Sequence, residues 1–91
     1  MIINDKEYNV SPENIIRILT SNFSPRCQEQ AVRLAERNAN IMLDRHGYYS
    51  DPMKLRELSE KYGITKEAAR TFVKRAERKL VNQLIREKEN S

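Results

Sequence analysis

The stretch from Asp51 to Leu80 decides the fold, and it reads DPMKLRELSEKYGITKEAARTFVKRAERKL. Aspartate directly before proline is typical of a helix start, because its side chain can cap the first turn. An apolar stripe at helical spacing follows, made of Leu55, Leu58 and Tyr62. Gly63 then ends the helix, since glycine readily adopts the left-handed conformation, and Ile64 can fold back onto it. The pattern predicts a helix over residues 52–62 and a sharp turn.

The second half of the stretch continues as another helix. Thr65 can cap its first turn, and its inward face is apolar, formed by Ala69, Phe72 and Val73. Two helices joined by a glycine turn in this way predict a helix-turn-helix over residues 52–80, in which the second helix can enter the major groove of DNA.

The outward side of this second helix carries polar side chains suited to DNA. Lys66, Arg70 and Lys74 recur at steps of four, so they project from one face. Arginine can pair with two acceptors of guanine, a carboxylate can accept from cytosine, and lysine neutralises phosphate. Composition alone would favour a solvated helix face, but the position directly after the turn favours DNA. The candidate base-reading residues are Lys66, Glu67, Arg70, Thr71 and Lys74.

The charge is unevenly distributed along the 91 residues, whose net charge is +4. Residues 1–52 hold six Lys and Arg against seven Asp and Glu, whereas residues 53–91 hold eleven against six. A basic second half indicates a polyanionic partner, and double-stranded DNA is the one that fits a helix-turn-helix.

Two further helices are expected before this motif. A serine directly precedes a proline at two places, and these pairs predict helices over residues 12–21 and 25–46. Asn38 and Asn40 are poor helix formers, so the second helix could break near them. Residues 1–10 alternate loosely and could form a short β-hairpin. The expected fold class is therefore all-α, a four-helix domain with a C-terminal helix-turn-helix and that short hairpin before it.

The last helix is expected to run from after Thr65 to about Lys88. Beyond Leu80 it adds an apolar strip, made of Val81, Leu84 and Ile85. The strip could be covered within the chain by Ile15, Ile16 and Leu19, or by a second copy of the chain. We expect the intrachain cover and a monomer, because so small a domain needs that buried area; a homodimer is the alternative.

Catalytic and metal chemistry are not expected. Cys27 and His46 are the only soft metal ligands, and a zinc site needs about four ligands. We expect Cys27 to be a small buried side chain. We expect Tyr48 and Tyr49 to pack in the core or its loop, and stacking on a DNA base is the alternative for them. A single cysteine, with no apolar run long enough for a membrane span and no signal sequence, favours the cytoplasm and the nucleoid of a bacterial cell. No cofactor is expected.

The segment from Leu55 to Leu80 resembles region four of the sigma-70 family of bacterial transcription factors, notably in LRELSEKYGIT, KEAAR and KRAERKL. Upstream, FSPR at residues 23–26 and DRHG at residues 44–47 resemble the start and end of the preceding helix of that region. Thr71 stands where the family more usually has glutamine, so promoter specificity does not carry over. The chain also has no room for the part of a sigma factor that melts the promoter.

The resemblance implies a free-standing, phage-type or bacterial transcription regulator, or one piece of a split sigma factor. It implies that Lys66, Glu67, Arg70 and Thr71 read the promoter element near minus thirty-five, and that three further basic residues face the DNA backbone, namely Arg75, Arg78 and Lys79. It also implies that residues 40–62 could contact the flap of the RNA polymerase β subunit.

Residues 1–91 are expected to form a single domain. Residues 1–22 would be an extension of hairpin and helix, 23–80 the region-four-like part, and 81–91 a helix extension and tail. Two other functions fit the sequence. One is a protein–protein module that binds RNA polymerase or a sigma factor without touching DNA, and the other is a dimeric helix-turn-helix repressor or DNA-packaging protein.

Overall fold

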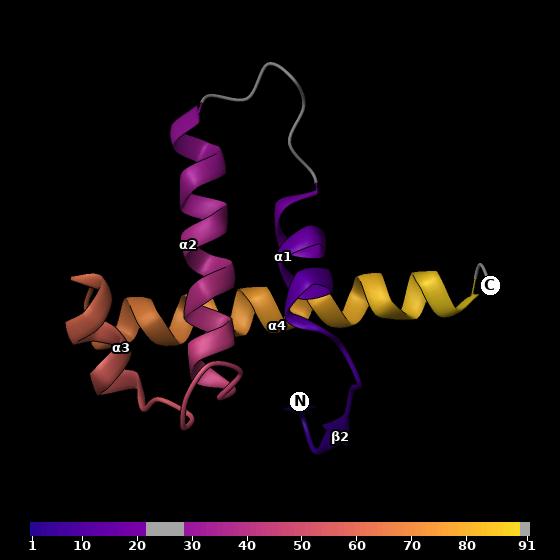
Figure 1. The fold of residues 1–91 in the computed structure, drawn as a ribbon, viewed down its shortest axis with the longest axis horizontal. Coiled ribbons are helices and arrows are strands. Elements are labelled where there is room, and N and C mark those ends of the chain that lie inside the picture. Colours follow the sequence, from indigo (N-terminus) through magenta and orange to yellow (C-terminus); the bar gives the residue numbers. More distant parts are fainter. Residues whose placement is uncertain (22–28, 90–91) are drawn as a thin grey trace.

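The computed structural model describes residues 1–21 and 29–89. They form a short hairpin and four helices: β1 (Ile2–Ile3), β2 (Lys6–Glu7), α1 (Pro12–Thr20), α2 (Glu29–Arg45), α3 (Leu55–Tyr62) and α4 (Lys66–Glu89). The all-α fold class, the four helices and the hairpin are confirmed. Helices α1 and α2 lie side by side across α4, and α3 packs at the beginning of α4 (Figure 1). None of the described helices combines the length and the apolar character that crossing a membrane requires.

The β1–β2 hairpin is antiparallel and pairs Ile3 with Lys6. Its two turn residues, Asn4 and Asp5, have φ values of 51° and 65°. Two successive residues with positive φ are typical of a type I′ hairpin turn, and Asn and Asp tolerate this conformation better than other side chains. Ile3 is 3% exposed, so the hairpin is anchored in the core.

Helix α1 begins where the sequence predicts. The Ser11 Oγ accepts a hydrogen bond from the Asn14 N–H at 3.2 Å, and Pro12 occupies the first helical position. The inward side of the helix differs by one residue from the prediction. Ile15 and Leu19 are buried as expected, whereas Ile18 is buried in place of Ile16, which is half-buried.

Helix α2 is continuous through Asn38 and Asn40, so the break that these residues made possible does not occur. The residues around the two asparagines explain this, because four side chains there are fully buried: Ala39, Ile41, Met42 and Leu43. Tertiary packing of this kind outweighs a low helix propensity. The predicted start of the helix at Pro25 lies outside the described residues, as do Cys27 and the FSPR segment.

Helix α3 begins at Leu55, three residues later than predicted, so Asp51 and Pro52 do not start it. They belong instead to a loop that is held to the end of α2. The Met53 N–H donates to the Asp44 carbonyl at 3.0 Å, and Arg45 Nη1 donates to the Met53 carbonyl at 2.9 Å. These bonds keep the loop extended up to Lys54, which becomes the residue before the helix.

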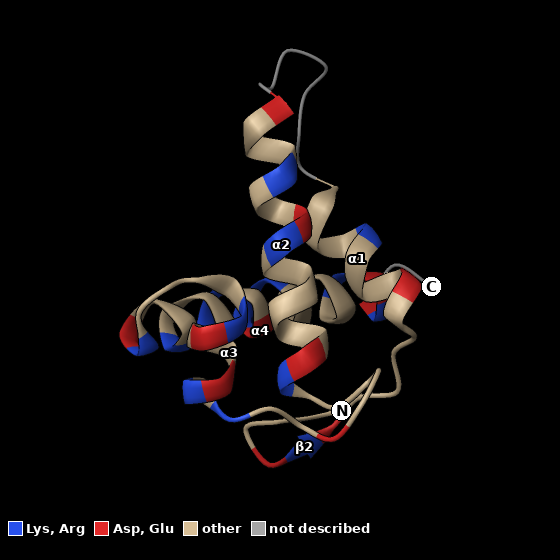
Figure 2. Ribbon diagram, turned by 60° about the vertical axis from the view of Figure 1, so that its left-hand side comes forward, with Lys and Arg blue, Asp and Glu red and all other residues tan. Residues whose placement is uncertain are grey.

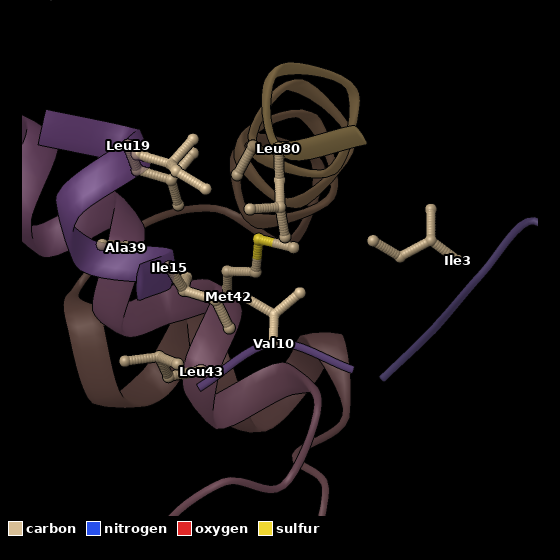
Figure 3. Close-up of a cluster of buried hydrophobic side chains, with 10 residues drawn as sticks. Ile3, Val10, Ile15, Leu19, Ala39, Met42, Leu43 and Leu80 are labelled. Carbon is tan, nitrogen blue, oxygen red and sulfur yellow. The ribbon is translucent and has the colours of Figure 1, made fainter. Parts of the chain in front are cut away.

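Two apolar clusters share α4. The first joins the hairpin, α1, α2 and the middle of α4, and Figure 3 shows Ile15, Met42 and Leu80 within it. The second joins α2, α3 and the first turns of α4, and its buried members are Ile41, Leu58, Ala69 and Val73. Val81 and Leu84 pack against the first cluster, which confirms the expected intrachain cover for these two residues. Ile85 remains 45% exposed.

Candidate nucleic-acid interface

The turn between α3 and α4 has the geometry that the sequence predicts. Gly63 has φ 64° and ψ 37°, the left-handed conformation. The Ile64 N–H donates to the Ser59 carbonyl at 3.1 Å, the long-range bond of a Schellman stop. A Cβ atom built on Gly63 would meet nothing within 4 Å. Glycine is therefore favoured at this position because it adopts the left-handed conformation, and not because a side chain would clash with a neighbouring atom.

The start of α4 is capped as expected. The Thr65 Oγ1 accepts a hydrogen bond from the Ala68 N–H at 3.0 Å, which satisfies one of the free donors of the first turn. The stop at Gly63 and this cap follow each other directly. Together they set where α3 ends and where α4 begins.

A buried aspartate holds α3 against α2. Asp44 is 4% exposed, and its Oδ2 accepts hydrogen bonds from Lys61 Nζ at 2.8 Å and from the Tyr62 hydroxyl at 2.5 Å. Burial, and then the hydrogen bond to Asp44, raise the pKa of Tyr62 well above its usual value near 10. The last turn of α3, and with it the turn at Gly63, is thus fixed to the end of α2. Sequence reasoning missed this role; the available signal is an acidic residue directly after the apolar run at 41–43.

The structure brings the predicted base-reading residues together on the open side of α4. The five residues are exposed, whereas Ala69 and Val73 on the opposite side are 0% and 6% exposed. Arg70 Nε lies 3.7 Å from Glu67 Oε2, and both side chains are more than half exposed. An exposed ion pair of this kind contributes little to stability, so both groups can reorganise around a ligand.

The three predicted backbone-facing residues are not equivalent. Arg75 and Arg78 are exposed. Lys79 is half-buried, and its Nζ lies 3.3 Å from the carbonyl oxygen of Leu19 at the end of α1. Successive helix residues lie about 100° apart around the axis, so Arg75 and Lys79 face a different side of α4 from Lys74. Of the eight candidate residues, Arg75 and Lys79 therefore lie on a flank of α4, and the other six form its recognition face.

Most cations of this region have no acidic partner. Figure 2 shows Lys and Arg mixed with Asp and Glu at the α3–α4 end of the molecule. Within residues 1–21 and 29–89, the ion pairs closer than 4.0 Å include none made by Lys66, Lys74, Arg75 or Arg78. Glu77, an acidic residue of α4, lies 3.0 Å from His46 Nε2. Lys66, Lys74, Arg75 and Arg78 are therefore available to contact an anion.

The remaining residues of chemical interest are structural. The Tyr48 hydroxyl donates to the Val10 carbonyl at 2.8 Å, so Tyr48 packs under its loop as expected, and its burial raises its pKa. Tyr49 is 60% exposed, so it does not pack in the core. Among the described residues, no three His, Cys, Asp or Glu side chains are grouped as metal ligands would be.

Comparison with known families bears directly on this geometry. A family model described as an HTH DNA-binding domain matches residues 44–82. This part of the chain is similar to helix-turn-helix DNA-binding domains, and the match supports DNA binding. The match begins at Asp44, the residue that fixes α3, and ends on α4 after Leu80, the last buried residue of that helix. It supports a helix-turn-helix in general and does not point to region four of sigma factors. No curated protein and no solved structure matches the chain.

Proposed function

We propose that this protein is a transcription regulator that binds a specific sequence of double-stranded DNA through α4. The observation that carries the proposal is the open face of α4, where Lys66, Arg70 and Lys74 project directly after the Gly63 turn of a helix-turn-helix domain. In such domains the first turns of the second helix contact base edges in the major groove. The proposal gives the protein a binding role and no catalytic step.

Each residue of the face has a distinct proposed role. Arg70 can make the bidentate contact with O6 and N7 of a guanine, and Glu67 can accept a hydrogen bond from the amino group of a neighbouring cytosine. The ion pair between them is long and exposed, so it can open when DNA binds. Thr71 can contact a base edge through its hydroxyl group, or it can contact the methyl group of a thymine through its own methyl group. Lys66, Lys74, Arg75 and Arg78 would neutralise phosphates, with Lys79 contributing after release from Leu19.

We further propose that the DNA is promoter-like and that RNA polymerase takes part. The support is the resemblance of residues 55–80 to region four of sigma factors, which also suggests residues 40–62 as the surface for the β-subunit flap. The regulator would act as a monomer at the nucleoid of a bacterial or phage-infected cell, since α1 covers much of the apolar strip of α4.

A second candidate function is a protein-binding module, and a specific observation favours it. An apolar groove of about 340 Å³ lies between α1, α2 and α4. Leu34, which lines it, is 45% exposed, and Phe72 is half-buried there. A Leu34→Glu variant separates the two functions. If the groove carries the function, the Leu34→Glu variant no longer retains polymerase in a pull-down. If α4 carries the function, the Leu34→Glu variant binds DNA like the wild type.

The direct test is selection of bound sequences from a pool of random double-stranded DNA, with and without RNA polymerase core enzyme. A transcription regulator of the proposed kind enriches one sequence motif in the absence of polymerase, and polymerase increases the enrichment. Recovery of unrelated sequences in both arms would contradict sequence-specific binding. Enrichment that is equal in the two arms would contradict the polymerase contact alone.

A further inference from the structure

The tip of the β1–β2 hairpin lies beside α4, although the two segments are about seventy residues apart in the chain. Ile3 and Asn4 form one wall of a slot of about 430 Å³. The other wall belongs to α4, and its residues are Lys74, Glu77, Arg78, Val81 and Asn82. The slot thus joins the hairpin to the second half of the helix that carries the recognition face.

The slot opens on the same side of α4 as the recognition residues. Arg70, Lys74, Arg78 and Asn82 follow one another at steps of four, which keeps them on one side of a helix. The four buried residues of α4 lie on the other side, namely Ala69, Val73, Ala76 and Leu80. A DNA duplex held by the first turns of α4 would therefore face the slot as well.

The length of the helix places a DNA backbone near this position. An α-helix rises about 1.5 Å per residue, so Lys74 lies about 12 Å along the axis from Lys66. This distance is close to the width of the major groove, about 12 Å. A helix that crosses the groove with its first two turns leaves it, and passes one sugar–phosphate backbone, in the region of Lys74 and Arg78.

The chemistry of the slot suits a phosphate group. Lys74 and Arg78 are exposed, and neither makes an ion pair within 4.0 Å in the part of the chain that the structure describes. Glu77 also borders the slot, but its carboxylate lies 3.0 Å from His46. Asn4 adds an amide donor from the hairpin side. Asp5, exposed at the tip, is the one hairpin turn residue whose charge opposes an anion.

We propose that this slot holds a phosphate of the DNA backbone, and that the β1–β2 hairpin is a second DNA-contacting element beside α4. The inference rests on the proposed function, because it requires DNA on the open face of α4. It assigns the hairpin a role in affinity and not in base recognition. The negative charge of Asp5 then limits the affinity for DNA. Its removal should therefore strengthen DNA binding, which provides a test.

The test uses two substitutions that the turn tolerates. Asn and Asp both accept positive φ, so Asn4→Asp and Asp5→Asn leave the type I′ turn in place. Glu29→Gln is the control, because Glu29 begins α2 at the end of that helix far from the hairpin (Figure 1). Each full-length variant is titrated against the selected DNA by fluorescence anisotropy at two salt concentrations, and its thermal unfolding is recorded to establish that it folds.

The inference predicts opposite shifts. Asn4→Asp weakens binding by about three- to tenfold and Asp5→Asn strengthens it by about two- to fivefold, because each changes one charge within a Debye length of a phosphate. Both shifts shrink at higher salt, and Glu29→Gln binds like the wild type. If the wild type binds its DNA but the two hairpin variants bind equally well, the hairpin role is wrong and the proposed function stands. If the wild type binds DNA without sequence preference and the two variants still shift in opposite directions, the proposed function is wrong and the hairpin role stands; if the wild type binds no DNA, both are wrong.

Discussion

The Tyr62 hydroxyl donates a hydrogen bond to the Asp44 carboxylate at 2.5 Å, and this contact fixes the last turn of α3 to the end of α2. Lys61 reaches the same oxygen at 2.8 Å. The recognition helix starts only four residues after Tyr62, so its direction depends on this anchor. The buried carboxylate is thus part of the support of the DNA-binding face, although it is not on that face.

Removal of the carboxylate should destabilise the protein. Asp44→Ala leaves the half-buried Tyr62 hydroxyl without its acceptor, and we expect a loss of about 2 to 3 kcal/mol in the free energy of unfolding measured with urea. Tyr62→Phe removes one partner only and should cost about 1 to 2 kcal/mol. Equal stability of the wild type and Asp44→Ala would show that the contact does not support α3.

The raised pKa of Tyr62 predicts a loss of stability at alkaline pH. The tyrosine of the unfolded chain loses its proton near pH 10, while Tyr62 in the folded chain keeps it. The stabilisation is therefore complete below about pH 10 and falls as the pH rises above it. Urea unfolding at pH 8, 10 and 11 should show this decline, and the decline should be smaller in Tyr62→Phe. Parallel curves for the two proteins would rule out Tyr62 as its source.

The two glycines with positive φ should respond differently to substitution. Gly63→Ala costs about 1 kcal/mol in free energy of unfolding, because only the left-handed conformation is penalised there. Gly47→Ala should cost about 2 to 3 kcal/mol, because its Cβ would also lie 2.8 Å from Pro52 Cγ. Gly63→Asn, which tolerates positive φ, should recover most of the first loss. A larger cost at Gly63 than at Gly47 would contradict this account.

Phosphate contacts by α4 should appear in the salt dependence of DNA binding. Lys74→Ala should reduce the slope of log K against log salt by about 0.9, the value for one phosphate contact. Arg33→Ala serves as the control, because Arg33 is exposed and paired with Glu29 on the distant half of α2. Its slope should equal that of the wild type. If the Lys74 variant keeps the full slope, its ammonium does not contact the backbone.

Local signals predicted the motif because caps and stops depend on residues three or four positions apart. Ser11, Gly63 and Thr65 each act within that range, and each was predicted correctly. The start of α3 was predicted three residues too early. The loop before it is held by hydrogen bonds to Asp44 and Arg45, and no local sequence pattern encodes these bonds.

The same distinction applies to the candidate site. The helical period alone places Lys66, Arg70 and Lys74 on the open side of α4, and the structure agrees. The helical period does not predict that Lys79 contacts the Leu19 carbonyl, or that Asn4 lies across a slot from Lys74. Both relationships depend on how α1 and the hairpin pack against α4, and this packing brings together residues about sixty to seventy positions apart.

The most direct test of the central claim is the ratio of affinities for the selected DNA and for random DNA in Arg70→Ala. Sequence reading by α4 predicts that this variant loses about 1 to 3 kcal/mol of binding free energy on the selected site, and much less on random DNA. Arg33→Ala should leave both affinities unchanged. An equal loss of affinity on the two DNAs in Arg70→Ala, or no loss on either, would contradict the claim that α4 reads the sequence.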